Sequence, residues 1–306
     1  MLSYFQAILL GLVQGITELF PVSSLGHSVL IANLFNWHEL TKQQTADNSP
    51  FLSLLIMMHV ATALALLIFY RLEWIRVVKG FVRSLQTRDL THDSDARLAW
   101  LLIAATIPAG LIGVVFEHTF RAVFAQGFFA MIFLAINGVM LIKGDKLVSQ
   151  AELNRPRRRR NQASEQLAAT KTVRMVSDHL SLGRAGLIGV AQTGALFAGI
   201  SRSGITMLAG LRSGLDHQDS ARFSFLLATP IILAAGLYKL PSFLSASNDS
   251  IRPQILAGSV VAGVAAYVSV RYLDKYFQNR SLRPFGLYCI GFAIFFLLVS
   301  IIRGAS

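Results

Sequence analysis

Long apolar stretches separated by short polar segments run through nearly the whole chain. Six of them are close to or above the about 20 residues that a helix needs to cross a bilayer. They cover residues 51–70, 98–116, 124–143, 223–240, 255–273 and 285–302. The hydrophobic pattern therefore predicts an all-α polytopic membrane protein with six transmembrane helices.

Two further apolar stretches, residues 5–33 and 185–213, are interrupted midway by Gly, Ser or Pro and carry ionisable side chains. Broken backbone at membrane depth is tolerated only where protein or a water-filled cavity surrounds it. We therefore expect two re-entrant helix–loop–helix hairpins, each entering and leaving the membrane by the same face. The alternative is an arrangement with eight crossings, in which both stretches span the membrane.

Composition excludes an ordinary soluble domain. Apolar residues make up 54% of the 306 positions and charged residues 14%, with a mean hydropathy of +0.54. A soluble domain averages roughly 25% charged residues, so this chain has too little polar surface to face water on all sides. The net charge of +12 arises between the apolar stretches, where Lys and Arg set topology and contact anionic lipid. We therefore expect no nucleic-acid partner.

The distribution of Lys and Arg predicts the orientation. With six crossings, residues 71–97, 143–184 and 271–284 share one side and hold twenty Lys and Arg, whereas the other side holds five. The positive-inside rule makes the first side cytoplasmic and places both termini outside. Residues 144–184, which include the run RPRRRR, then form a basic cytoplasmic linker.

The two interrupted stretches resemble each other. Aligning Gln14 with Gln192 pairs Gly11 with Gly189, Ser23 with Ser201, Gly26 with Gly204, and Ser28 with Thr206. Each hairpin is followed by three crossings, so the second half must be inverted. We expect a single membrane domain over residues 1–306, with a first repeat at 1–143, the linker at 144–184 and an inverted second repeat at 185–306. Such repeats place their polar site near the midplane, where the hairpins meet.

The first hairpin carries the candidate acid. Gln14 and Glu18 are four residues apart, so on a helix they share one face. A carboxylate at the centre of a membrane helix costs about 2.5–3.5 kcal/mol and tends to be kept for a metal, a proton or a counter-ion. A glutamate at a helix end that reaches lipid headgroups is the alternative.

The segment PVSSLGH, which follows directly, offers groups for anion binding and proton transfer. Pro21 ends or kinks the helix, and Gly26 permits a tight turn. Ser23 and Ser24 supply hydroxyl and backbone N–H donors of the kind that bind anions. His27 can exchange a proton near neutral pH.

The second hairpin supplies the positive charge in the segment AGISRSGIT. Arg202 lies between Ser201 and Ser203, with Gly199 and Gly204 beyond them. A guanidinium pairs bidentately with phosphate oxygens, and small neighbours let a phosphate approach the backbone. The alternative is that this arginine only neutralises the carboxylate of the first hairpin. His59, inside a predicted span, suits a packing role as well as a functional one.

These residues identify a family resemblance. GLVQGITELFPVSSLGH resembles the first signature of the undecaprenyl-diphosphate phosphatases, the bacitracin-resistance family, which contains Pro-Val-Ser-Ser-Thr-Gly-His. GVAQTGALFAGISRSGITMLAGL resembles the second, Pro-Gly-x-Ser-Arg-Ser-Gly, and the likeness covers nearly the whole chain apart from residues 144–182. Two positions depart from the family: Leu25 replaces a Thr and Ala198 replaces a Pro.

The resemblance implies a dimeric enzyme of the bacterial inner membrane with its site open to the periplasm. Its activity would convert undecaprenyl diphosphate to undecaprenyl phosphate for peptidoglycan synthesis, confer bacitracin resistance and depend on a divalent metal, Mg²⁺ or Ca²⁺. The catalytic positions carried over are Glu18, Ser24, His27 and Arg202, with Glu18 also the metal ligand. The substrate-binding positions are Gln14, Ser23, Gly199, Ser201, Ser203 and Gly204.

The sequence leaves two questions open. The nucleophile is His27, Ser24 or water. The alternative to an enzyme is a lipid transporter that flips polyprenyl phosphate across the membrane, because inverted repeats with midplane hairpins also suit alternating access.

Overall fold

The computed structural model describes residues 2–37, 50–88, 93–124, 127–153, 176, 180–244 and 246–304, and the regular elements within them are all helical. The first half holds α1 (Tyr4–Thr17), α2 (Ser24–Leu34), α4 (Pro50–Phe69), α5 (Arg71–Thr87), α6 (Ser94–Phe124) and α7 (Gly127–Leu153). The second half holds α10 (Leu182–Gln192), η1 (Thr193–Leu196), α11 (Arg202–Arg212), α12 (His217–Leu244), η2 (Ala246–Ile251), α13 (Arg252–Tyr276) and α14 (Arg283–Gly304). The predicted all-α fold is confirmed.

Six helices in the described part of the chain are long and apolar enough to cross a membrane, as the sequence predicted. These spans are Phe51–Phe69, Ser94–Phe116, Gly127–Val148, His217–Pro241, Asp249–Tyr276 and Arg283–Gly304. The two interrupted stretches are indeed broken into short helices. The longest of these, α1, has 14 residues, and α2, α10 and α11 have 11 each, so none reaches the about 20 residues of a full crossing.

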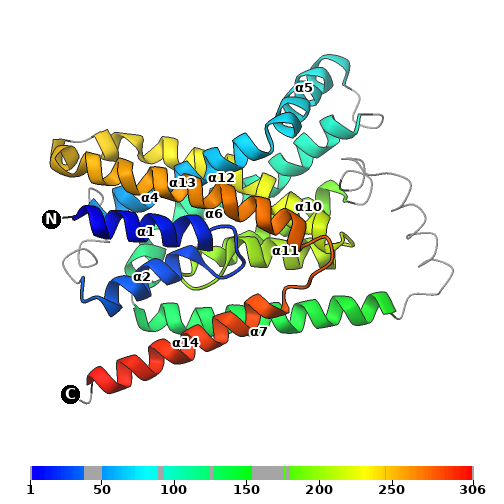
Figure 1. The fold of residues 1–306 in the computed structure, drawn as a ribbon. Helices are drawn as coiled ribbons and strands as arrows, with labels where there is room; N and C mark the ends of the chain where they lie inside the picture. Colours follow the sequence, from blue (N-terminus) through cyan, green and yellow to red (C-terminus); the bar gives the residue numbers. More distant parts are fainter. Residues whose placement is uncertain are drawn as a thin grey trace.

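The long helices lie side by side, and the two short helix pairs lie at opposite ends of the bundle (Figure 1). The pair α1–α2 lies at the end that holds both termini, where Arg303 Nη2 donates to the Leu34 carbonyl at 2.8 Å. The pair α10–α11 lies at the other end. There Asp145 of α7 contacts His217 of α12 at 2.7 Å and accepts from the Leu282 amide at 3.2 Å.

Small residues let the helices pack backbone against backbone, as is common in membrane proteins. A side chain at Gly11 of α1 would collide with the Gly258 carbonyl oxygen of α13, and one at Gly189 of α10 would collide with the Ala105 carbonyl oxygen of α6. These contacts fix α1 and α10, and hence the breaks that follow them, against long helices.

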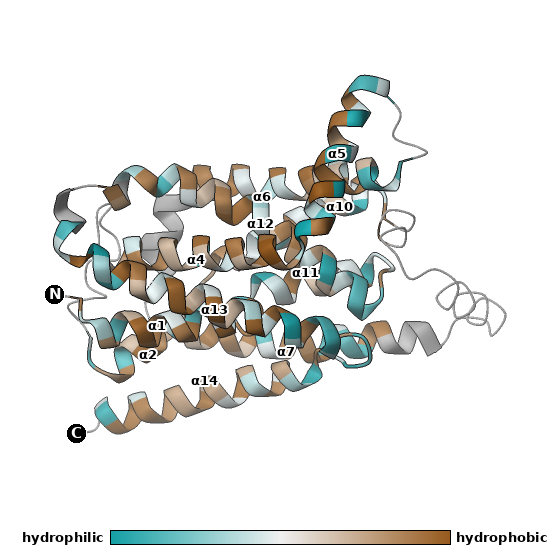
Figure 2. Ribbon diagram, turned by 45° about the horizontal axis from the view of Figure 1, so that its top comes forward, coloured by the Kyte–Doolittle hydropathy of each residue, from teal (hydrophilic) through white to brown (hydrophobic). Residues whose placement is uncertain are grey.

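Many large apolar side chains are exposed on the long helices, as expected for contact with lipid. Figure 2 shows hydrophobic residues along α13 and α14 and hydrophilic residues near the bundle ends and at the tip of α5. The hydrophobic pattern did not predict α5, which extends past the bundle. Glu73 at its start accepts from Arg222 of α12 at 2.8 Å, so the base of α5 is tied to the bundle.

The contact between α7 and α14 predicts opposite effects for two identical substitutions on α14. A methyl group at Gly286 would lie 2.7 Å from the Gly138 carbonyl oxygen, so Gly286→Ala should lower the free energy of unfolding by about 1–3 kcal/mol. A methyl group at Gly291 meets no described atom within 4 Å, so Gly291→Ala should be neutral or stabilise by up to about 1 kcal/mol. Thermal unfolding in detergent measures both, and equal stability of the two variants would contradict the close approach.

Candidate active site

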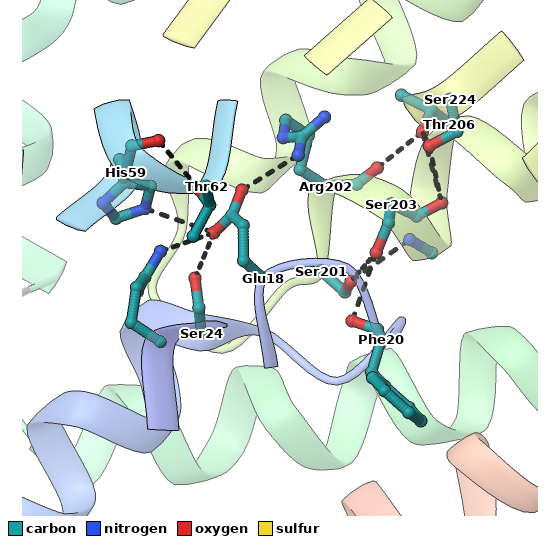
Figure 3. Close-up of polar contacts among 12 residues, drawn as sticks. Glu18, Phe20, Ser24, His59, Thr62, Ser201, Arg202, Ser203, Thr206 and Ser224 are labelled. Carbon is teal, nitrogen blue, oxygen red and sulfur yellow. Dashed lines mark hydrogen bonds and ion pairs between the residues drawn. The ribbon is translucent and has the colours of Figure 1, made fainter. Parts of the chain in front are cut away.

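The break between α1 and α2 meets the break between η1 and α11 inside the bundle. The Gly199 amide donates to Ser23 Oγ at 3.1 Å. The Ser203 hydroxyl donates to the Phe20 carbonyl at 3.2 Å (Figure 3). Backbone outside a helix must find hydrogen-bond partners within an apolar bundle. Each break therefore supplies partners for the other.

Asn137, in the middle of α7, joins both breaks. Its Nδ2 donates to the Pro21 carbonyl at 3.1 Å, and its Oδ1 accepts from the Ser201 amide at 3.0 Å. The side chain is fully buried. One amide thus satisfies a backbone acceptor of the first break and a backbone donor of the second.

A buried carboxylate lies where the two breaks meet. Glu18 Oε1 accepts from Arg202 Nη2 at 2.9 Å. Its Oε2 accepts from the Ser24 hydroxyl at 2.6 Å and from Gln14 Nε2 at 3.0 Å, and lies 3.3 Å from His59 Nε2. Figure 3 shows Glu18 with Arg202 on one side and Ser24 and His59 on the other. A buried charge requires such partners, and these come from α1, α2, α4 and α11.

A cavity of about 320 Å³ opens beside this carboxylate. Its polar lining is Glu18, Ser23, Ser24, His59, Gln192, Ser201 and Arg202. Its apolar lining is Leu25, Ile56, Ala109, Ala195, Leu196, Ile200, Ile231, Ile232, Ala235 and Gly236. Arg202 Nη1 is buried and has no hydrogen-bond partner in the described part of the chain. The cavity can therefore offer a guanidinium donor, a hydroxyl and a carboxylate to a phosphorylated group that carries an apolar chain.

The first break holds a strained residue. Ser23 has a φ of 69°, in the left-handed region, and caps α2 by accepting from the Gly26 amide at 3.4 Å. A side chain on Gly26 would approach Gly199 Cα to 3.1 Å, so the two breaks touch at their glycines. Strain of about 1–3 kcal/mol persists only where surrounding contacts enforce it, and it clusters at functional sites.

The structure brings together only part of the predicted set. Five of the predicted residues line the cavity: Glu18, Ser23, Ser24, Ser201 and Arg202. Four more lie outside the lining but form hydrogen bonds to Glu18 or to residues of the two breaks: Gln14, Gly199, Ser203 and Gly204. The chemical roles of all these residues stay predictions.

His27 lies outside the cavity lining. Its Nδ1 is 2.8 Å from the Ser23 carbonyl oxygen, and its Nε2 is 2.9 Å from the Tyr288 hydroxyl. The ring also stacks on Phe292 of α14 with centroids 4.3 Å apart. In this structure His27 connects the turn at Ser23 to α14.

Sequence reasoning left the role of His59 undecided and gave Gln192 no role beyond the repeat alignment. The structure places His59 against the Glu18 carboxylate and Gln192 in the cavity wall. An ionisable side chain inside an apolar stretch was the available signal for His59. For Gln192, the available signal was its alignment with Gln14.

A divalent metal fits the residues around Glu18 only if substrate completes its ligands. Within the described residues, no group of three or more His, Cys, Asp or Glu could hold a metal. Gln14 Oε1, beside Glu18, is buried and has no hydrogen-bond partner among the described residues. A carboxylate and an amide oxygen are hard ligands of the kind that Mg²⁺ and Ca²⁺ use, and Mg²⁺ commonly takes further oxygens from substrate phosphates.

Comparison with known proteins gives consistent matches over nearly the full chain. The family described as "Bacitracin resistance protein BacA" matches residues 7–295. "Undecaprenyl-diphosphatase 2" of Frankia alni is 46% identical over 94% of this chain and 95% of the relative. "Undecaprenyl-diphosphatase" of Mycolicibacterium paratuberculosis is 46% identical over 94% of both chains. "Undecaprenyl-diphosphatase 2" of Chromobacterium violaceum is 41% identical over 97% of this chain and 99% of the relative.

Proposed function

This chain belongs to the bacitracin resistance protein BacA family, and we propose that it hydrolyses undecaprenyl diphosphate to undecaprenyl phosphate and phosphate. Relatives matching nearly the whole chain are named for this reaction. The observation that carries the proposal is the cavity in which a carboxylate, a hydroxyl and a guanidinium converge. This reaction recycles the lipid carrier for cell-wall synthesis and accounts for bacitracin resistance.

Phosphate release from undecaprenyl diphosphate by the purified protein in detergent tests this function. The relatives' names favour hydrolysis over the alternative, a transporter that flips polyprenyl phosphate. Binding of the lipid without release of phosphate would favour the transporter.

Ser24 is the proposed nucleophile, because its hydroxyl lines the cavity and donates to Glu18 at 2.6 Å. Arg202 Nη1 would hold the terminal phosphate. Ser24 Oγ would attack that phosphorus as its proton passes to Glu18, and the bond to the bridging oxygen would break, leaving its electrons on undecaprenyl phosphate. Water would then hydrolyse the phosphoserine and release phosphate. His27, predicted as base or nucleophile, would hold the turn that presents Ser24.

Two serine substitutions on α2 test this assignment. Ser24→Ala should reduce phosphate release by about 10³-fold or more, because nucleophile removal typically costs that much or more. Ser28→Ala is the matched control, since this hydroxyl is fully buried on the same helix and lies outside the cavity lining. Wild-type turnover by Ser24→Ala would return the attack to water or His27.

The proposed metal is Mg²⁺ or Ca²⁺, held by Glu18 and the amide oxygen of Gln14 together with diphosphate oxygens. When bound, it would offset negative charge on the phosphate oxygens. Two observations support this metal. Glu18 carries the only carboxylate in the lining of this cavity. Gln14 Oε1, next to it, is buried and has no hydrogen-bond partner among the described residues.

Chelation tests the metal. Excess EDTA should abolish phosphate release, and added Mg²⁺ or Ca²⁺ should restore it. Gln14→Leu should raise the metal concentration needed for half-maximal activity, because one oxygen ligand is lost. Unchanged turnover in EDTA would remove the metal from the mechanism.

Arg202 should tolerate even lysine poorly. Lysine offers a compact point charge, whereas the guanidinium can bond Glu18 through Nη2 and a phosphate oxygen through Nη1. Arg202→Lys should lower kcat/KM by about ten- to a thousandfold, because lysine keeps the charge and loses only part of the about 2–5 kcal/mol that removal of one partner of a buried charged pair costs. Arg184→Lys is the control, because this exposed guanidinium bonds only the Ser213 carbonyl among described partners. An Arg202→Lys variant with wild-type kcat/KM would make Arg202 a counter-charge only.

The architecture we propose is an inverted repeat in which α1–α2 and α10–α11 are re-entrant hairpins. The two pairs lie at opposite ends of the bundle (Figure 1). The aligned Gly11 and Gly189 each touch the backbone of a long helix from the other half, at Gly258 of α13 and Ala105 of α6. Since α6 and α13 hold the same place in their halves, these contacts support the repeat. The predicted linker, residues 144–184, lies largely outside the described residues.

The proposed location is the bacterial inner membrane, with both termini and the site facing the periplasm. The charge asymmetry supports the orientation. The cavity is lined by Ile56, early in α4, and by Gly236, late in α12, both of which lie toward the end that holds the termini.

The homodimer is proposed on the family resemblance alone, and a monomeric molar mass in detergent and in nanodiscs would contradict it.

Thiol labelling of intact cells tests the orientation. In a Cys289→Ala background, a membrane-impermeant reagent should label Gly304→Cys at the end of α14 but not Lys79→Cys on α5. Both positions are exposed and would lie on opposite sides of the membrane. Labelling of both cysteines in intact cells would contradict six crossings with external termini. So would a result in which neither cysteine is labelled in intact cells and both are labelled after lysis.

A further inference from the structure

Gln192 is a buried side chain of the cavity wall that the mechanism above does not use. It ends α10 and is 3% exposed. Neither Nε2 nor Oε1 has a hydrogen-bond partner in the residues that the structure describes. Its repeat counterpart, Gln14, donates to Glu18 at 3.0 Å. The two glutamines therefore differ, since only Gln14 has its amide nitrogen satisfied within the protein.

An amide left unpaired in an apolar enclosure is unfavourable, so its presence indicates a partner that arrives from outside. A second buried donor in the same wall, Arg202 Nη1, also has no partner among the described residues. Two such donors favour an occupant with several negatively charged oxygens. A diphosphate supplies these oxygens.

The backbone holds Gln192 in a defined place. A side chain on Gly189, one turn earlier, would collide with the Ala105 carbonyl oxygen, so α10 packs directly on α6. The hydroxyl of Thr193 donates to the Val190 carbonyl at 2.7 Å and closes the last turn. Gln192 thus reaches the cavity from a fixed helix end, in the half of the chain that does not carry Glu18 and Ser24.

We propose that Gln192 is a substrate-binding residue whose Nε2 donates to an oxygen of the diphosphate that Arg202 Nη1 also holds. The inference rests on the proposed function and deepens it. The second half of the chain then supplies both the charged and the neutral donor, while the first half supplies the nucleophile and its base. Because the amide is neutral and does not move a proton, its loss weakens binding and leaves the chemical step largely intact.

Kinetics of three variants test this role. Gln192→Leu should raise KM for undecaprenyl diphosphate about ten- to a hundredfold, the range expected for a hydrogen bond to a charged group, with kcat within about threefold of wild type. Gln192→Glu should raise KM further because its charge repels phosphate. Leu187→Ala, at an exposed position of the same helix outside the cavity lining, should keep the wild-type KM.

Stability separates binding from a structural role. Leucine removes an unpaired amide, so Gln192→Leu should unfold at the same or a higher temperature than wild type while binding substrate more weakly. If Gln192 were structural, the variant would instead lose stability and keep its KM.

Inorganic diphosphate gives a readout that does not require turnover. Diphosphate should raise the unfolding temperature of the wild type. Gln192→Leu should need a diphosphate concentration at least about ten times higher for the same shift. If the wild type binds diphosphate but releases no phosphate from the lipid, the proposed function fails and the role of Gln192 stands. A wild-type KM together with a wild-type diphosphate response in Gln192→Leu would overturn the inference.

Discussion

The structure depends on how two breaks in its helices satisfy their backbone polar groups inside an apolar bundle. Lipid offers no hydrogen bonds, so each unsatisfied group there costs several kcal/mol. The breaks meet this requirement with each other: the Gly199 amide bonds Ser23 Oγ, and Asn137 bonds a backbone group of each. Two segments that are unfavourable separately become favourable as a pair.

The contact between the two breaks also forms the candidate active site. Glu18 and Arg202 lie 184 residues apart in sequence but are in contact, with Arg202 Nη2 2.9 Å from Glu18 Oε1, because each lies at the edge of one of the breaks. The carboxylate also takes the Ser24 hydroxyl, which strained Ser23 presents at the start of α2. The contacts that stabilise the breaks are therefore those that position the proposed nucleophile, base and phosphate-binding group. Loss of one should affect stability and chemistry together.

The sequence predicted the parts of this structure that local pattern determines. Apolar length identified the six spans, and interruption by Pro, Ser and Gly identified the breaks. The sequence predicted a polar site where the two interrupted stretches meet, and in the structure Arg202 Nη2 lies 2.9 Å from Glu18 Oε1. The orientation of His27 could not be predicted, because Tyr288, which lies 261 residues away, holds its ring. The contact of His59 with Glu18 likewise depends on how α4 packs against α1. The helix α5 was not predicted because its sequence is too polar to be recognised as a membrane-spanning helix.

A double-mutant cycle between the two breaks tests the central claim most directly. Glu18→Gln and Arg202→Met, alone and together, would be compared by reversible unfolding in detergent. Breaking a buried ion pair from one side typically costs about 3–5 kcal/mol because the other charge is left unpaired. The double variant should therefore lose at least about 2 kcal/mol less than the sum of the single losses. Losses that add to within about 0.5 kcal/mol would show that the breaks do not stabilise each other through this pair and would contradict the account.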